Sequence, residues 1–164
     1  MPQRYRLVKG NTKIALNIAG RFQPPTNAHL LVVESAILQA KRMGANLYLT
    51  LDESHDQEKN PLNIDQRIRF LKILLSQSNV SLEFMNESSF LAEGYERVVD
   101  VQQNMGNPDK ERLSGISPVF MRHAAKTGDL QQFSTGLPAW VSEQNALTIL
   151  NAMRQGMKLP NLQK

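Results

Sequence analysis

The chain has 164 residues, of which 41% are hydrophobic, enough to fill one core, so we expect one domain. Its formal net charge of +4 suits a small polyanionic ligand but is too modest to argue for nucleic acid on charge alone. The absence of cysteine excludes disulfides and thiolate metal sites. Its apolar runs are too short to cross a membrane, and its basic start lacks the apolar stretch of a signal peptide, so we expect a cytoplasmic protein.

The first elements alternate between strands and a helix. Two short apolar runs, residues 5–8 and 14–19, are separated by a Lys-Gly-Asn turn, which predicts a hairpin whose second strand is buried. Apolar residues recur at helical spacing over 29–43, and Gly44 ends that helix. Residues 46–51 form another buried strand. This succession of strand, helix and strand predicts a right-handed crossover with parallel strands.

The middle of the chain continues this alternation. Residues 52–61 are polar and follow a strand's carboxyl end, where open α/β sheets keep their ligands. A second amphipathic helix follows, with Asn63 or Asp65 as its cap. We then expect strands at 80–85 and 97–101, separated by a short helix.

The last third of the chain is predicted to be helical, after a polar loop at residues 102–114. Ser117 can cap the free amides of a helix, and Pro118 fits its first position without loss of a hydrogen bond. A short helix at 130–133 and a final amphipathic helix ending at Gly156 complete the chain. We expect the only tryptophan to anchor the final helix on the sheet, and the last residues to fray.

The most informative segment is residues 20–29, GRFQPPTNAH, which joins the second apolar run to the first helix. Glycine lets backbone approach a ligand, arginine offers a bidentate donor for phosphate, and histidine can donate to phosphate without a permanent charge. At a helix N-terminus such groups indicate a phosphate site. The alternative is an ordinary connection in which Thr or Asn caps the helix and His satisfies a loop carbonyl.

This segment resembles the nucleotidyltransferase superfamily of nicotinamide mononucleotide adenylyltransferases and cytidylyltransferases, and in particular its phage-encoded members, which carry GRFxPPTxGH after the first strand of a Rossmann-like sheet. The sequence KNPL at 59–62 and the helix after it are similar to theirs, as is ISPVFMR at 116–122. Segments at 128–138 and 153–157 extend the likeness over most of the chain. The resemblance implies one nucleotidyltransferase-like domain.

The implied fold is α/β and Rossmann-like, with a mainly parallel sheet, flanking helices and a C-terminal helical segment. Residues 1–138 would form the α/β core and residues 139–164 the last helix and tail. The implied reaction transfers a nucleoside monophosphate from ATP or CTP to a small phosphorylated acceptor and releases pyrophosphate. Mg²⁺ would accompany the triphosphate, held by phosphate and water, with no metal ligand from the protein.

The resemblance also implies site residues. His29 would contact the α-phosphate, and Lys59 and Arg122 would hold the triphosphate, so these three are the expected catalytic residues. Thr26 stands where many relatives have the first of two histidines. The expected nucleotide-binding residues are Gly20, Arg21, Phe22, Thr26, His29 and Ser117.

Three substitutions and one shortened segment depart from the family pattern and support a second hypothesis. Ala28 replaces a glycine, Val119 a threonine and Phe120 a lysine, and the chain is shortened between residues 101 and 117. The alternative is a catalytically inactive phage-type protein of the same fold, acting as a homo-oligomer or with phage structural proteins. It would then lie in the host cytoplasm or in the virion.

Weaker candidates remain. Nucleic-acid binding through the basic N-terminus rests on charge alone and is not favoured. His55 lies among acidic residues, but a solvated loop is favoured over a metal site because no distant ligand matches it. His123 is interpreted equally well as a phosphate contact or as a surface residue.

Overall fold

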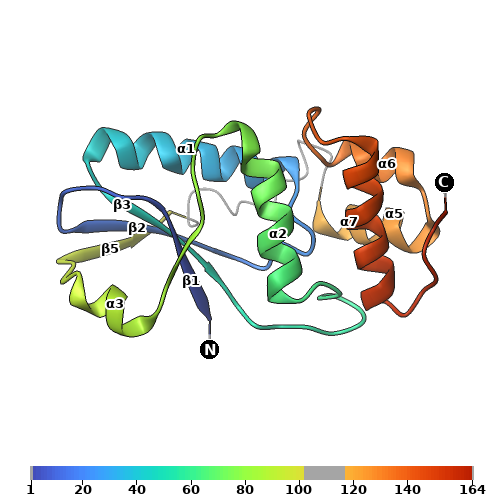
Figure 1. Cartoon of the computed structure of the whole chain (residues 1–164), viewed down its shortest axis with the longest axis horizontal. Coiled ribbons are helices and arrows are strands. Elements are labelled where there is room, and N and C mark those ends of the chain that lie inside the picture. The colour runs from blue at the N-terminus through green and yellow to red at the C-terminus, as the bar shows by residue number, and fades with distance from the viewer. Residues whose placement is uncertain (1, 102–116, 164) are drawn as a thin grey trace.

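The computed structural model describes residues 2–101 and 117–163, so the predicted loop at 102–114 lies outside the described residues. Figure 1 shows two parts, a sheet flanked by helices at one end and a separate group of helices at the other. The strands are β1 (Gln3–Val8), β2 (Ile14–Gly20), β3 (Asn46–Leu51), β4 (Glu83–Met85) and β5 (Arg97–Asp100). The helices are α1 (Asn27–Met43), α2 (Ile64–Leu74), the 3₁₀ turn η1 (Leu75–Gln77), α3 (Glu87–Ala92), α5 (Pro118–Thr127), α6 (Leu130–Thr135) and α7 (Glu143–Gly156).

The helix ends follow the local sequence signals. Thr26, Asn63 and Ser117 are the N-caps of α1, α2 and α5, and each accepts a hydrogen bond from a backbone N–H in the first turn of its helix. Gly44 and Gly128 end α1 and α5 in the left-handed region, with φ of 67° and 76°. The predicted caps Asn63 and Ser117 and the predicted stop at Gly44 are therefore confirmed.

The sheet is mixed, with the strand order β4-β1-β3-β2-β5. Strand β2 is parallel to β3 and β5, whereas β1 is antiparallel to β3 and β4. The predicted crossover geometry of β2, α1 and β3 is confirmed in its parallel pairing. The expectation of a mainly parallel sheet is wrong, because two of the four pairings are antiparallel.

The expected hairpin of the first two strands is also wrong, since β3 lies between them. Leu49 faces both neighbours, opposite Tyr5 in β1 and Ile18 in β2. The reason is burial: β3 carries buried side chains on both faces, including Leu47 and Tyr48, which requires a central position. Strand β1 has a polar face with Arg4 and suits a place nearer the edge.

The sheet packs α1 and α2 on one face and α3 on the other. Apolar side chains of the first face, such as Leu16 and Leu49, form one core with Val33 of α1 and Leu71 of α2. On the opposite face Tyr48 packs with Phe90 and Tyr95, in and just after α3. The helices α1 and α2 thus enclose the core beneath the strands whose ends carry the candidate site.

Helices α5, α6 and α7 surround a second core that α2 joins to the first. Phe70 and Leu74 of α2 contact this second core, whereas Ile68 and Leu71 face the sheet. Trp140 is 44% exposed, so the expectation that it anchors the last helix on the sheet is wrong. Smaller side chains of α6 and α7, among them Phe133 and Leu150, form the core against α5 without it.

The tail after α7 is held in place, contrary to the expectation that it frays. Asn151 pairs with the backbone of Leu162 through two hydrogen bonds, of 2.7 and 3.1 Å. The buried Arg154 donates to the carbonyl of Pro160 (2.7 Å) and to the carbonyl of Ala125 (2.9 Å) near the end of α5. These polar pairs fix the tail against the helical group.

Candidate functional site

The topology brings two loops to the carboxyl end of β2. Strand β3 lies on one side of β2 and β5 on the other, so the strand order changes direction at β2. Such a switch point is where open α/β sheets bind ligands. Residues 20–26 leave β2 here, and residues 52–63 leave β3 at the same edge. The segment singled out by its sequence therefore meets the polar loop after β3.

His29 is fixed in the first turn of α1 as a neutral hydrogen-bond donor. The backbone N–H of Thr26 donates to Nδ1 of His29 at 3.1 Å, completing a reciprocal capping box. Because a backbone N–H can only donate, Nδ1 is the acceptor and the ring proton lies on Nε2. Burial lowers the pKa of His29 to about 4, so the ring is neutral at pH 7. Within the described residues Nε2 has no partner, and it can donate to an anion at the helix N-terminus.

Phe22 packs against the His29 ring, and Gly20 packs against Phe22. Phe22 is only 2% exposed, and its ring packs edge-on against the imidazole with the centroids 4.7 Å apart. A Cβ at residue 20 would lie 2.7 Å from the Phe22 ring, so any larger residue there would push this buried ring out of place. The structure thus gives both residues a role in holding His29, whereas the resemblance implies direct contact with the nucleotide.

The loop after β3 is organised by Asp56. Its Oδ1 accepts the backbone N–H groups of Glu58, Lys59 and Asn60 at 3.0, 2.8 and 3.2 Å. Its Oδ2 accepts from the side-chain amide of Asn60 at 2.7 Å. The Asn60 amide first, and then the backbone donors, lower the pKa of Asp56 to about 2, so the carboxylate is ionised at neutral pH.

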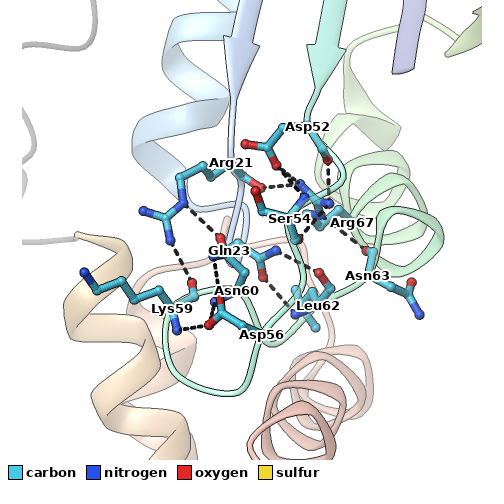
Figure 2. A network of polar contacts seen from close by, with 10 residues as sticks. All are labelled: Arg21, Gln23, Asp52, Ser54, Asp56, Lys59, Asn60, Leu62, Asn63 and Arg67. Atoms are coloured by element: carbon cyan, nitrogen blue, oxygen red, sulfur yellow. Dashed lines mark hydrogen bonds and ion pairs between the residues drawn. The ribbon is translucent and has the colours of Figure 1, made fainter. Parts of the chain in front are cut away.

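Arg21 reaches from the first loop into the second. Its Nε donates to Oδ1 of Asn60 at 2.9 Å, and its Nη2 donates to the carbonyl of Lys59 at 3.1 Å. Figure 2 shows the Arg21 guanidinium and the Lys59 side chain extending on the same side of the loop. Lys59 itself is exposed. The two cations that the sequence predicts are therefore neighbours.

Two buried side chains join the loops from behind. Arg67 of α2 donates to the carbonyl of Arg21 at 3.0 Å and to the carbonyl of Asp52 at 2.8 Å. The Gln23 amide exchanges two hydrogen bonds with the backbone of Leu62, at 2.7 and 2.9 Å. Figure 2 shows these contacts tying the turn after β2 to the loop after β3. Hydrogen bonds from Arg67 and Gln23 therefore hold the two loops of the site together.

Arg122 of α5 adds a third cation. It is half-buried, and its Nη1 donates to the carbonyl of Gln23 at 3.1 Å. Burial, and next the nearby Arg21 guanidinium, lower the pKa of Arg122, whereas Asp56 opposes this shift. This effect of Arg21 places Arg122 in the same electrostatic neighbourhood as Arg21. Unbalanced positive charge of this kind is suited to a polyanion.

Ser117 is less closely connected to the cluster. Its Oγ accepts the backbone N–H of Phe120 at 3.1 Å as the cap of α5. No hydrogen bond joins it to the other predicted site residues within residues 2–101 and 117–163. The structure therefore gathers Arg21, Lys59 and Arg122 on the turn after β2 and the loop after β3. His29 lies at the start of α1, where that turn ends, and Ser117 lies at the start of the neighbouring α5.

The two substitutions on α5 that depart from the family pattern lie in different environments. Val119 is 66% exposed, whereas Phe120 is partly buried and packs on the helical core. His123 is exposed, as the surface interpretation expects. Nε2 of His55 lies 3.3 Å from the carbonyl oxygen of Pro61. No cluster of three metal-ligating side chains occurs in the described part of the chain.

The C-terminal helix also supports the loop. A Cβ at Gly156 would lie 1.9 Å from the carbonyl oxygen of Pro61, so α7 packs backbone against backbone on this loop. Gln57 donates to the carbonyl of Met157 at 3.2 Å. Sequence reasoning used Gly156 only as the end of the last helix and Asn60 only as part of the KNPL motif, and it gave neither of them, nor Asp56, a role in the site. The Asp and Asn spacing was a usable signal, because both residues favour side-chain to backbone turns.

Comparison with known proteins adds no identification, since no family model, curated protein or solved structure matches the chain. Among the described helices none is long and apolar enough to cross a membrane.

Proposed function

We propose that this protein is a nucleotidyltransferase-like enzyme that transfers a nucleoside monophosphate from ATP or CTP to a small phosphorylated acceptor. The observation that carries the proposal is His29, a neutral donor at the start of α1, which follows the turn where Arg21 and Arg122 meet the Lys59 loop. In keeping with this, we regard β2, α1, β3 and β5 as the Rossmann-like half of the mixed sheet.

The chemistry needs little from the protein beyond position and charge. An acceptor phosphate oxygen attacks the α-phosphorus, the bond to the β-phosphate oxygen breaks, and pyrophosphate leaves. Charge develops on the non-bridging α-phosphate oxygens and on the leaving group. In our proposal His29 Nε2 donates to the α-phosphate, while Lys59 and Arg122 stabilise the leaving pyrophosphate.

Mg²⁺ would enter with the triphosphate. The described residues around the proposed phosphate positions are cationic and provide no group of three carboxylate or imidazole ligands. The donor set therefore fits a metal bound by phosphate oxygens and water rather than by a protein cage. The protein's cations would then share with the metal the task of neutralising the triphosphate.

Pyrophosphate release tests this function directly. The full chain is incubated with Mg²⁺, each of the four labelled nucleoside triphosphates and a panel of phosphomonoesters. We expect turnover with ATP or CTP that falls by at least tenfold in His29→Gln, which keeps a side-chain acceptor for the Thr26 N–H. Absence of pyrophosphate with every combination would refute the enzymatic function.

One observation favours the alternative of an inactive scaffold protein. Val119, beside Ser117 on α5, is 66% exposed where the resembled family has a polar residue, and an exposed apolar side chain suits a protein contact. In this alternative the chain forms homo-oligomers or binds phage structural proteins, in the host cytoplasm or the virion. Solution mass and thermal shift separate the two: a stable oligomer without any shift by Mg-ATP or Mg-CTP supports the scaffold.

A further inference from the structure

Arg21 is oriented by a chain of two hydrogen bonds that ends on Asp56. The Asp56 carboxylate accepts from Nδ2 of Asn60 at 2.7 Å, and Oδ1 of Asn60 accepts from Nε of Arg21 at 2.9 Å. Asn60 is only 7% exposed, so its amide has little freedom to turn. The carboxylate accepts only, which fixes which end of the amide faces Arg21.

Two hydrogen bonds leave one side of the Arg21 guanidinium available to a ligand. Nε is used by Asn60 and Nη2 by the carbonyl of Lys59, whereas Nη1 of Arg21 has no partner in the described part of the chain. In Figure 2 the guanidinium extends away from Asp52 and Arg67, on the side of the loop where Lys59 lies. A guanidinium held in this way presents its donors in one fixed orientation.

We propose that Asp56 and Asn60 are positioning residues, a relay that holds Arg21 in the orientation in which it binds the phosphates of the ligand. This inference rests on the proposed function, since it assigns Arg21 to the same phosphate site. Neither residue touches the ligand. Their contribution is to lower the entropy that Arg21 loses when a phosphate binds.

The relay and simple electrostatics predict effects of opposite sign. Asp56 is an exposed carboxylate whose charge reaches Arg122, so its charge alone repels an anionic ligand bound there. If charge were its only effect, Asp56→Asn would bind polyphosphate more tightly. The relay predicts weaker binding, by about tenfold, because roughly one charge-assisted hydrogen bond to the ligand loses its alignment.

Asp56→Asn breaks the relay at one place. The three backbone N–H groups all donate to Oδ1, which an asparagine retains. Its Nδ2 would replace Oδ2 and face Nδ2 of Asn60, donor against donor. The Asn60 amide must then turn, which brings a donor to Nε of Arg21. Asn60→Ala removes the same link without altering Asp56 and serves as a second variant.

The reciprocal double variant restores the pattern at constant charge. In Asp56→Asn with Asn60→Asp, residue 56 keeps an acceptor for the backbone and donates its amide to the carboxylate at 60. That carboxylate then accepts from Nε of Arg21. The double variant has the same net charge as the wild type, so recovery of Arg21 order and of binding identifies orientation as the cause.

Two measurements on the full chain test the relay. The first is the ¹⁵N-edited NMR signal of the Arg21 Nε–H, assigned with Arg21→Lys, together with its exchange rate with water. The second is the dissociation constant for inorganic tripolyphosphate and for ATP by calorimetry. We expect both single variants to increase exchange and to weaken binding by about tenfold, and the double variant to recover both.

The outcomes separate the relay from the proposed function. Equal or tighter binding by Asp56→Asn, or an unchanged Arg21 signal in both single variants, would overturn the relay while leaving phosphate binding intact. A wild-type chain that binds neither probe would overturn the proposed function and the ligand part of the inference. The Arg21 signal would then still decide whether Asp56 and Asn60 hold the guanidinium.

Discussion

Arg67→Met tests how the two loops of the site are held together. Arg67 is 0% exposed and donates to the carbonyls of Arg21 and Asp52 at 3.0 and 2.8 Å. Longer contacts of 3.4 Å reach the carbonyls of Ser54 and Asn63. Methionine fills a similar volume without a donor, so these acceptors lose their partner.

The size of the effect follows from these contacts. The ion pair with Asp52 contributes little, because that side chain is 45% exposed and its oxygen is 3.3 Å away. The two short hydrogen bonds decide the result, since each carbonyl left without a partner costs about 1–3 kcal/mol. Apolar packing of the methionine offsets part of this cost, so the free energy of unfolding should fall by about 3 kcal/mol. This corresponds to a fall in Tm of roughly 6–12 °C for a domain of this size.

Urea and thermal unfolding followed by circular dichroism measure this loss. Arg69→Met is the matched control, because Arg69 is exposed on the same helix and its loss should change stability by less than about 0.5 kcal/mol. Equal stability of the two variants would refute the reasoning that buried hydrogen bonds from Arg67 hold the loops. A large loss in Arg69→Met would refute it equally.

Three further changes probe other parts of the structure. Gly156→Ala places a methyl 1.9 Å from the Pro61 carbonyl oxygen and should cost about 1–3 kcal/mol in urea unfolding. The pKa of His29 is about 4 in the folded chain and 6.5 when unfolded, so the free energy of unfolding decreases as pH falls from 6.5 towards 4. Between pH 7.5 and 5 the wild type should therefore lose about 2 kcal/mol more than His29→Gln. Asn151→Ala removes both hydrogen bonds to Leu162 and should cost about 1–2 kcal/mol, with faster proteolysis of the tail.

Each of these predictions has a contrary result. Gln144→Ala, exposed on α7, is the control for Gly156→Ala, and similar stability of the two would show that α7 does not pack closely on the loop. Parallel stability curves of wild type and His29→Gln between pH 5 and 7.5 would show that the imidazole is not held neutral. A tail cleaved at the wild-type rate in Asn151→Ala would show that it is held elsewhere.

Local signals in the sequence predict the helix ends and most strands. Thr26, Asn63 and Ser117 cap helices because their short polar side chains reach the first free amides, a property independent of the rest of the fold. The buried run at β3 is equally local, since Leu47, Leu49 and Leu51 can only lie inside. These features needed no knowledge of distant contacts.

The order of the strands could not be predicted from the sequence in the same way. A short turn between β1 and β2 favours a hairpin, but burial of both faces of β3 outweighs it and places β3 between them. Trp140 shows the same limit: its size favours burial, yet the helical core is filled without it. Both outcomes depend on competition between segments far apart in the chain.

Part of the candidate site follows from local sequence, and part depends on contacts between distant segments. The placement of His29 at the start of α1 follows from the order of strand, loop and helix. The hydrogen bond between Arg21 and Asn60 joins residues 39 positions apart, and it depends on the parallel pairing of β2 with β3. The residue types indicated phosphate chemistry, whereas their mutual support became visible only in three dimensions.

A crystal structure of the chain soaked with Mg²⁺ and ATP, or with Mg²⁺ and CTP, tests the phosphate site most directly. The account predicts a nucleotide at the carboxyl end of β2, with a phosphate oxygen about 3 Å from Nε2 of His29 and others near Arg21 and Arg122. A triphosphate bound elsewhere, or no bound nucleotide at a concentration that saturates ordinary nucleotide-binding sites, would contradict it.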